Sequence, residues 1–403
     1  MDHRRSEQAG MTRRQLLQAA GVGGVYFWLA PHLLSAAPVD LGGPSPGKDL
    51  IVHNTKPWNG EPELPNLVNS WITPHKYFYV RTNGPIPKLD PKEFTLTVEG
   101  LVNKPLTLTL AELQEKYPQV STVATMTCAG NRRDELNQMK AISGVQWRGG
   151  AIGNAEWSGV DMAKVLETAG IKPEAKHLWF EGADVHEKGG KQTGFGASIP
   201  LERAMDRRLK PGAMIATQMN GEALKPEHGY PMRAMIPGYI GARSVKWLGK
   251  IVVSDRPSEN YYMSHSYKLV QEATAEELKQ ADPLYEYRVN NAICTPSPDT
   301  KVPAGKLAVQ GYALPTGEPG TTIARVELST DGGQTWTDAQ MTSPAKPFCW
   351  RLWKAEVTVT PQTKLILARA TDSRGNTQPK DLPWNAKGYM NNGWYRTPVQ
   401  VAG

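Results

Sequence analysis

Beyond about residue 280, the sequence becomes a series of short runs in which apolar and polar residues alternate. The runs follow one another about ten residues apart, and turn-forming stretches such as 331–333 (Asp-Gly-Gly) and 372–375 (Asp-Ser-Arg-Gly) separate them. Short strands at this spacing are typical of two packed antiparallel sheets. The pattern therefore predicts an all-β, immunoglobulin-like sandwich over residues 281–403, with strands at 307–312, 322–329, 335–340, 351–359 and 365–371.

The preceding part of the chain mixes the two periodicities. Alternating runs at 94–98 and 106–110 predict strands, and the 3.6-residue pattern at 111–117 and 161–169 predicts helices. We therefore expect a mixed α+β domain over residues 71–272, followed by a charged helical stretch at 273–280. Residues 38–70 are rich in Pro, Gly and Asn, which favours an irregular, extended N-terminal arm.

The first 37 residues have the pattern of an export signal. Arg13 and Arg14 precede a weakly apolar stretch, and Ser35-Ala36-Ala37 is a small-residue cleavage site. A retained membrane anchor is the alternative, but the Gly and polar content of the stretch disfavours it. We expect a twin-arginine signal peptide over residues 1–37, recognised by the twin-arginine translocase, and a periplasmic mature protein. Because this route carries folded proteins, the leader also suggests a cofactor that is inserted before export.

Composition narrows the possible functions. Across 403 residues the formal charge is +7, and no Lys/Arg run of the kind that binds nucleic acid is present. The three cysteines, Cys128, Cys294 and Cys349, include no CxxC pair, which argues against a zinc site or a disulfide framework. Export permits a disulfide between Cys294 and Cys349, and burial as small apolar residues is equally compatible with the sequence.

Cys128 stands where the β-rich run 120–128 ends, directly before Ala-Gly-Asn and the pair Arg132-Arg133. Two nearby guanidinium groups favour the thiolate, which is the form that binds metals or attacks electrophiles. A single thiolate cannot complete a zinc site, but it suits a metal whose other ligands come from an organic cofactor. A buried cysteine beside surface arginines is the alternative that spacing alone leaves open.

Two further stretches have the composition of ligand-binding loops. The first, residues 226–248, places His228, Arg233, Arg243 and Lys246 among glycines, which suits an anion such as a cofactor phosphate. A solvated basic loop would look the same. The second, residues 184–198, is Gly-rich and offers acceptors for the polar edge of a ring, although composition alone favours an ordinary surface loop.

These motifs together resemble the sulfite oxidase family of molybdenum enzymes. The matching segments are 125–133 (TMTCAGNRR), 228–233 (HGYPMR) and 241–248 (GARSVKWL). Further matches follow in the same order, namely 196–200 (GASIP), 266–268 (SYK) and 392–396 (NGWYR), so the resemblance spans about residues 70–400. It implies the family's molybdopterin domain followed by its dimerisation domain, and therefore a homodimer.

The resemblance also implies roles for individual residues. Molybdenum would be held by molybdopterin and by the thiolate of Cys128, and three arginines would bind the anionic substrate, because guanidinium groups offer paired donors and keep their charge. Trp147 and Tyr267 would complete that pocket. The substrate arginines are Arg81, Arg133 and Arg396, and the residues implied to bind the pterin and its phosphate are Asp184, Ser198, His228, Arg233, Arg243, Ser244 and Lys246.

One departure concerns the pterin contacts. The chain has Thr82-Asn83-Gly84 where the vertebrate enzymes have Asn-His after the arginine, so a histidine is absent and Asn83 would substitute for it. Unlike those enzymes, the sequence shows no haem domain before Arg81. We therefore expect a periplasmic sulfite dehydrogenase that passes electrons to an external c-type cytochrome.

Four other functions compete with this interpretation. A reductase of S-oxides would use the same centre in reverse, but the full set of arginines suits an anion better. Eukaryotic nitrate reductases share the cysteine motif but carry haem and flavin domains for which this chain has no room. Relatives that oxidise sulfane sulfur typically lack the arginine pair. The non-enzymatic alternative is an exported binding protein with an incidental thiol.

Overall fold

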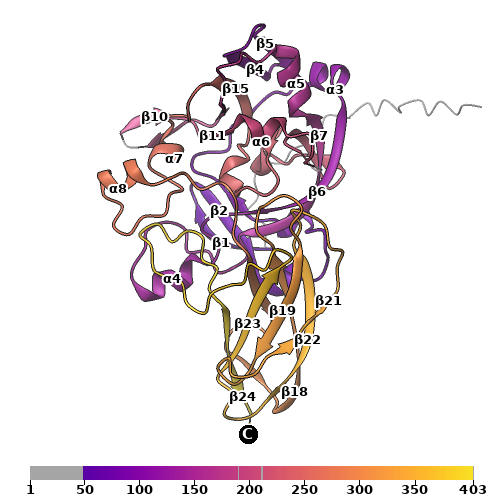
Figure 1. Cartoon of the computed structure of the whole chain (residues 1–403), viewed down its shortest axis with the longest axis vertical. Helices are drawn as coiled ribbons and strands as arrows, with labels where there is room; N and C mark the ends of the chain where they lie inside the picture. Colours follow the sequence, from indigo (N-terminus) through magenta and orange to yellow (C-terminus); the bar gives the residue numbers. More distant parts are fainter. Residues whose placement is uncertain (1–48, 189, 210–211, 403) are drawn as a thin grey trace, which may run out of the picture. The chain divides into compact units, whose positions relative to one another are not determined.

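The computed structural model describes residues 49–188, 190–209 and 212–402 (Figure 1). The predicted leader and the first part of the predicted arm lie outside these residues. Within them, residues from 49 onward form one compact unit that contains two kinds of architecture. None of the helices in the described ranges is long and apolar enough to cross a membrane.

The first architecture is a mixed α+β domain built on two sheets. The first sheet has the order β11 (Gly196–Pro200), β8 (His177–Gly182), β15 (Leu248–Ser254), β4 (Thr95–Gly100) and β5 (Leu106–Thr109). Its strands are antiparallel except for β15 and β4, which pair in parallel. The other sheet is antiparallel, in the order β13 (Glu222–Ala223), β12 (Met214–Met219), β7 (Ile152–Asp161) and β6 (Gln119–Thr127), with β14 (Arg233–Met235) paired to β12.

Short helices and one small hairpin surround these sheets. The α-helices are α2 (Leu64–Leu67), α3 (Leu110–Lys116), α4 (Arg133–Met139), α5 (Met162–Ala169), α6 (Leu201–Met205), α7 (Tyr261–Ser264) and α8 (Ala275–Gln280). The 3₁₀ helices are η1 (His75–Tyr77), η2 (Pro226–His228) and η3 (Gly241–Arg243), and the hairpin pairs β9 (His186–Lys188) with β10 (Lys191–Thr193). Thr109 and Glu112 cap α3 reciprocally, which explains why this helix begins directly after a strand.

The second architecture is the predicted sandwich, coloured orange to yellow in Figure 1. One sheet has the order β16 (Asn290–Thr295), β18 (Gly305–Leu314), β22 (Arg351–Val359) and β21 (Gln340–Met341). The other has the order β17 (Thr300–Val302), β24 (Tyr395–Val401), β23 (Leu365–Asp372), β19 (Ile323–Ser329) and β20 (Thr337–Asp338). Alternate residues of these strands fill a core with Tyr312, Trp350 and Trp353. The predicted α+β class followed by a β-sandwich is therefore confirmed.

The prediction of an irregular arm is wrong for its second half. Strands β1 (Leu50–Thr55) and β2 (Trp58–Pro62) pair as a hairpin, and β2 also pairs with β3 (Val80–Arg81). The carboxylate of Glu61 is fully buried and accepts hydrogen bonds from the backbone N–H groups of Arg148 (2.8 Å) and Gly150 (2.7 Å). Pro57, Gly60 and Pro62 interrupt the alternation, which hides this strand pairing in the sequence.

Candidate molybdenum-cofactor site

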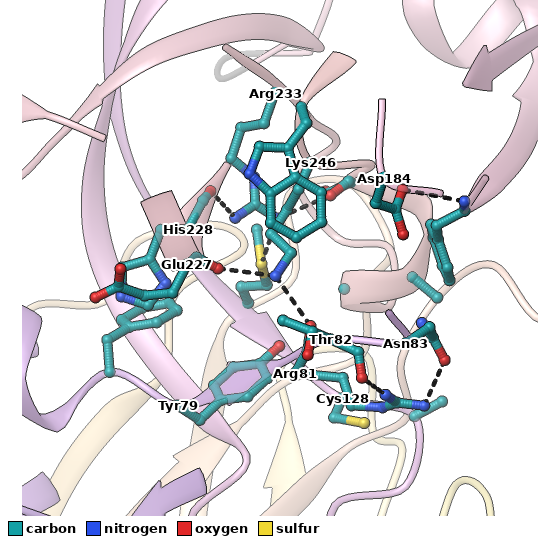
Figure 2. A pocket seen from close by; sticks show the side chains of 18 of the residues that line it. Tyr79, Arg81, Thr82, Asn83, Cys128, Asp184, Glu227, His228, Arg233 and Lys246 are labelled. Atoms are coloured by element: carbon teal, nitrogen blue, oxygen red, sulfur yellow. Dashed lines mark hydrogen bonds between the residues drawn. The ribbon is translucent and has the colours of Figure 1, made fainter. Parts of the chain in front are cut away.

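A single pocket collects most of the predicted site residues. It encloses about 680 Å³ of empty space, part of it open to solvent, and Figure 2 shows its lining. Strand ends and loops from five sequence regions meet there, and ligands commonly bind in such a place in a mixed fold. The predicted residues that line it are Arg81, Asn83, Cys128, Asp184, His228, Arg233, Ser244, Lys246 and Tyr267.

Cys128 reaches the pocket from the end of β6. Its side chain is 8% exposed, its N–H donates to the carbonyl of Ala151 (2.9 Å), and the N–H of Gly130 donates to its sulfur (3.4 Å). No cluster of three or more His, Cys, Asp or Glu side chains that could hold a metal occurs in the described part of the chain. A metal bound by Cys128 must therefore take its other ligands from a second molecule, as in an organic cofactor.

Arg132 does not face the pocket. Its left-handed backbone (φ 64°) turns the fully buried guanidinium toward the sandwich, where it donates to Asn290 Oδ1 (2.8 Å) and to the carbonyl of Gly393 (2.9 Å). Nε and Nη2 of Arg132 donate to the two carboxylate oxygens of Glu135 at 2.6 and 2.7 Å. This residue therefore joins the cysteine loop to the second domain.

Arg133 lies at the edge of the pocket without lining it. Its Nη1 donates to the carbonyl of Val145 (2.7 Å), its Nε donates to that of Lys387 (3.1 Å), and its guanidinium covers the ring of Tyr389. Tyr389 in turn stacks on Tyr267 with 5.3 Å between ring centroids. Arg133 is thus connected to the pocket lining only indirectly, through the stacked rings of Tyr389 and Tyr267.

Arg81 and Asn83 form one hydrogen-bonded unit on the pocket wall. Nη2 of Arg81 donates to Oδ1 of Asn83 (2.7 Å), and Nη1 donates to the carbonyl of Thr82 and to Oδ1 of Asn59 (3.3 Å). All of these partners are neutral, so the Arg81 side chain keeps its full positive charge available to an anion in the pocket.

Another part of the pocket lining brings together cations whose hydrogen bonds go to carbonyl groups and not to carboxylates. Arg233 donates to the carbonyls of His228 (2.7 Å) and Ser244 (2.8 Å), and Nζ of Lys246 donates to the carbonyls of Glu227 (2.8 Å) and Arg81 (3.0 Å). Burial lowers the pKa of Arg233 to about 10, and burial together with the charge of Arg233 holds the pKa of Lys246 well below its usual value. His228 is also held neutral, because burial first and then Lys246 and Arg233 depress its pKa strongly.

These unneutralised buried charges fit an anionic cofactor. Two buried cations side by side raise the energy of the protein alone, and a phosphate group would relieve both. Asp184 adds an acceptor on the same wall, since its Oδ2 is buried and has no hydrogen-bond partner among the described residues. A ligand with a phosphate and an N–H-bearing ring edge, as molybdopterin has, matches both features.

Besides Arg133 and Arg396, three predicted residues lie outside the lining, namely Ser198, Arg243 and Trp147. Ser198 is fully buried and its Oγ accepts the N–H of Ser258 (3.1 Å), while Arg243 donates to Leu284 (2.8 Å) and covers the rings of Tyr267 and Tyr285. Trp147 is fully buried behind Tyr79, with ring centroids 6.3 Å apart.

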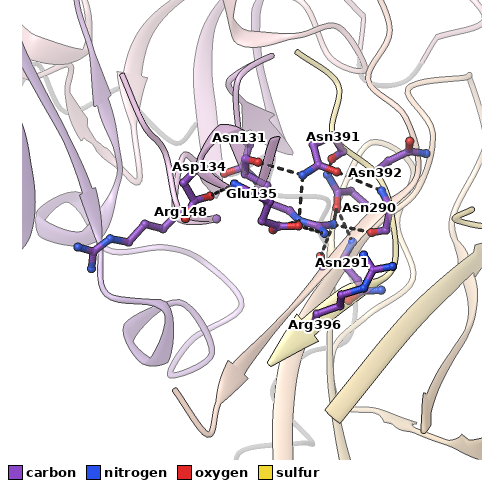
Figure 3. Close-up of polar contacts among 12 residues, drawn as sticks. Asn131, Asp134, Glu135, Arg148, Asn290, Asn291, Asn391, Asn392 and Arg396 are labelled. Carbon is purple, nitrogen blue, oxygen red and sulfur yellow. Dashed lines mark hydrogen bonds and ion pairs between the residues drawn. The ribbon is translucent and has the colours of Figure 1, made fainter. Parts of the chain in front are cut away.

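Arg396 is the clearest departure from the predicted set. It lies on β24 and donates to Asp381 Oδ1 (2.6 Å) and to the carbonyl of Lys380 (2.8 Å), on a separate groove of the surface (Figure 3). Within one chain, the three predicted substrate arginines therefore do not meet in one pocket, because β24 places the Arg396 side chain in the separate groove.

Several lining residues were not predicted. Phe78, Tyr79, Glu227 and Trp247 complete the walls, and burial strongly raises the pKa of the Tyr79 hydroxyl. Trp247 and Glu227 stand within the basic loop 226–248, so proximity to that motif was a usable signal. Phe78 and Tyr79 carry no such signal, since an aromatic pair next to a strand is ordinary core composition.

The three cysteines are all free thiols in the described structure. Burial raises the pKa of Cys349 to about 12 and that of Cys294 further still. Cys294 packs in the hydrophobic core of the sandwich, and Sγ of Cys349 donates to the carbonyl of Val123 (3.1 Å). The alternative of a disulfide between them is therefore wrong.

Comparison with known proteins agrees with the geometry. Residues 83–262 match the family model of the oxidoreductase molybdopterin binding domain, and residues 281–402 match that of the Mo-co oxidoreductase dimerisation domain. The fold and the site together define a molybdopterin-dependent oxidoreductase.

Similar proteins narrow the class to a family. The chain is 36% identical to sulfite oxidase of Gallus gallus over 95% of its length and 84% of that protein's, and 37% identical to mitochondrial sulfite oxidase of Rattus norvegicus over 87% and 66%. It is 38% identical to NADH nitrate reductase of Solanum lycopersicum, of which it spans 40%. The structure of the sulfane dehydrogenase SoxCD from Paracoccus pantotrophus superposes with a TM-score of 0.72 at 27% identity, covering 98% of this chain and all of that one. The chain belongs to the sulfite oxidase family of molybdenum enzymes, and its cofactor is molybdopterin-bound molybdenum.

Proposed function

We propose that the protein oxidises sulfite to sulfate and passes the electrons to an external c-type cytochrome. The reaction is SO₃²⁻ + H₂O → SO₄²⁻ + 2 H⁺ + 2 e⁻, so the site must bind a small dianion and release protons and electrons. One observation carries the proposal: Cys128 and the unneutralised Arg81 line the same pocket, so a metal ligand and an anion receptor share one cavity. When bound, the molybdenum cofactor supplies oxygen-atom transfer and accepts the two electrons.

The residues of the chain divide the remaining tasks. Cys128 would hold the metal, and Arg233, Lys246 and His228 would bind the phosphate, with Ser244 and Asn83 on the same walls. Arg81 would orient the sulfite oxygens with paired N–H donors and stabilise the negative charge that moves onto them. Tyr267 has a left-handed backbone conformation (φ 54°), and its side chain lines the same pocket. Its phenol would hydrogen-bond to the substrate or to the reacting oxygen.

The setting of the reaction is also proposed. The twin-arginine pattern at the N-terminus supports export and a periplasmic location. The match to the family's dimerisation domain supports a homodimer through the sandwich. A periplasmic cytochrome would then be the available one-electron acceptor.

A direct assay tests the reaction. The protein is purified from molybdenum-sufficient cells, and reduction of cytochrome c or ferricyanide is followed after sulfite is added, beside Cys128→Ser and with metal analysis of both. We expect sulfite-dependent reduction by the wild type, and its loss in Cys128→Ser. Wild-type protein that contains molybdenum and does not respond to sulfite would contradict the proposal.

The main alternative is a reductase of the same family. The identity to a nitrate reductase favours including nitrate, and an S-oxide such as dimethyl sulfoxide represents the other class. Both are tested by oxidation of reduced methyl viologen by the same preparation. Turnover of an S-oxide or nitrate without sulfite oxidation would reassign the function while leaving the cofactor site unchanged.

A further inference from the structure

A carboxylate and an imidazole face each other beside the pocket without a hydrogen bond between them. Asp184 lines the pocket at 1% exposure, and its Oδ1 accepts the N–H of Phe195 (3.1 Å). Its Oδ2 lies 3.3 Å from Nδ1 of His186, and neither atom has a hydrogen-bond partner within the described ranges. The other ring nitrogen, Nε2, lies 2.7 Å from the hydroxyl of Tyr262.

The backbone beside Arg81 leaves space for this ring. A Cβ atom at Gly84 would lie 2.6 Å from Cβ and 2.8 Å from Nδ1 of His186, which is closer than such atoms approach in proteins. Any other residue at position 84 would therefore displace the imidazole. Gly84 directly follows Asn83, which lines the pocket, so the ring is held between the pocket wall and Tyr262.

We propose that His186 is a positioning residue for the bound pterin: its imidazole takes up a proton in place of Asp184 and keeps that carboxylate available to the N–H edge of the pterin. The inference rests on the proposed placement of the pterin beside Asp184. Tyr262 suits this role because its hydroxyl can donate to a neutral Nε2 and accept from a protonated one.

The surrounding charges explain why the carboxylate needs such a partner. Burial raises the pKa of Asp184, although Lys246 on the neighbouring wall and His186 both oppose this. Burial lowers the pKa of His186, with Lys188 on its own strand and Arg81 on β3 adding to the effect and Asp184 opposing it. Tyr261 and Tyr267 are the other titratable groups near Tyr262, and burial raises the pKa of Tyr267.

Acidification therefore has two possible results at this pair. With His186 present, the added proton forms an imidazolium beside an intact carboxylate, which is an ion pair. Without it, the proton can only go to Asp184, whose raised pKa makes this happen at a higher pH than for an ordinary aspartate. Loss of His186 should thus make cofactor retention more sensitive to acid.

The experiment measures molybdenum retained by the loaded enzyme after desalting at a series of pH values. His186→Gln, whose amide does not titrate, is compared with wild type and with Tyr262→Phe. All three should retain the same molybdenum at about pH 8, the alkaline end of the series, before acid is added. The pH of half-release should rise by about one unit in His186→Gln and by less in Tyr262→Phe.

Two results would overturn the proposal. One is the same half-release pH in His186→Gln and wild type. The other is an equal loss of molybdenum from His186→Gln at every pH, which indicates packing alone. If His186→Gln does not fold, Tyr262→Phe decides the question through its own half-release pH. Asp184→Asn separates the premise from the inference: retention equal to wild type at every pH would show that the pterin does not lie beside Asp184.

Discussion

Two sets of buried cations in this molecule differ in what neutralises them. Arg132 is fully buried and meets the Glu135 carboxylate with two hydrogen bonds, as well as carbonyls of the sandwich. Arg233 is also buried and Lys246 is half-buried, but both contact only neutral groups in the described structure. A satisfied buried charge holds two parts of the protein together, whereas an unsatisfied pair indicates where a charged ligand binds.

The largest effect is expected at Arg132. Arg132→Met would leave Glu135 without its partner and remove the bonds to Asn290 and Gly393, so we expect a loss of about 3 kcal/mol in the free energy of unfolding. Because no ligand is involved, the loss should be equal with and without cofactor, as measured by denaturant titration of both forms. Arg148→Met, an exposed change nearby, is the matched control and should alter stability by less than about 0.5 kcal/mol. A loss confined to the loaded form would show that Arg132 serves the cofactor.

Arg233 should behave in the opposite way. Arg233→Met removes a charge that burial already disfavours, so the unfolding free energy of cofactor-free protein should change by less than about 1 kcal/mol. The extra stability that the cofactor gives should fall by about 2 kcal/mol, because a charged hydrogen-bonding partner of the phosphate is gone. Thermal and denaturant unfolding of both forms measures the difference. Equal changes in the two forms would remove the distinction between the two sets of cations.

A substitution at Asp134 tests whether the positive charge of Arg132 is already fully neutralised by Glu135. This carboxyl lies beside Glu135, and burial first and then Glu135 raise its pKa to about 7. Since the folded pKa exceeds the unfolded one, the stability of the wild type is greatest below about pH 4 and falls as the pH rises through 7. Asp134→Asn should therefore gain about 1 kcal/mol at about pH 8 and nothing at pH 4, in denaturant titrations at each pH. A loss at pH 8 would mean that the ionised carboxylate stabilises α4.

The smallest effect is expected at Arg396. It is partly exposed, paired with Asp381 and outside the pocket, so Arg396→Ala should change kcat/KM for sulfite by less than about twofold. Arg81→Gln, which alters the pocket wall, should lower kcat/KM by about 100-fold in the same assay. A comparable loss in Arg396→Ala would indicate that this arginine reaches the pocket of the partner subunit.

The sequence predicted the parts of the site that depend on local patterns. The β-rich run 120–128 predicted that Cys128 stands at a strand end. His228, Arg233 and Lys246 were predicted as site residues because they cluster within one loop, and all three line the pocket. Ser198 and Arg243 do not line the pocket, because adjacent residues on a strand or a tight turn point in different directions, and long-range pairing decides which of them faces the cavity. The contact between Asp184 and His186 follows from how the 182–186 segment turns, which no local pattern specifies.

Four strands of the sandwich, β18, β19, β22 and β23, were predicted closely because each carries its own alternation and is bounded by turns. Strands β16, β17 and β24 were not predicted, and the predicted strand 335–340 is divided between β20 and β21, which belong to different sheets. The hairpin β1–β2 was missed since its burial comes from Glu61 binding backbone groups almost 90 residues further along the chain. A buried carboxylate among Pro and Gly looks like a solvated loop until that partner is known. Long-range polar contacts are thus the main source of error here.

The attachment of Arg132 to the sandwich has a consequence for how the enzyme matures. The loop that presents the metal-binding thiol is anchored by side chains and carbonyls that exist in place only after residues 290 to 394 have folded. A chain caught before that point would offer its sulfur on an unanchored loop. We therefore expect stable metal binding to require a folded C-terminal domain as well as the domain that carries the cysteine.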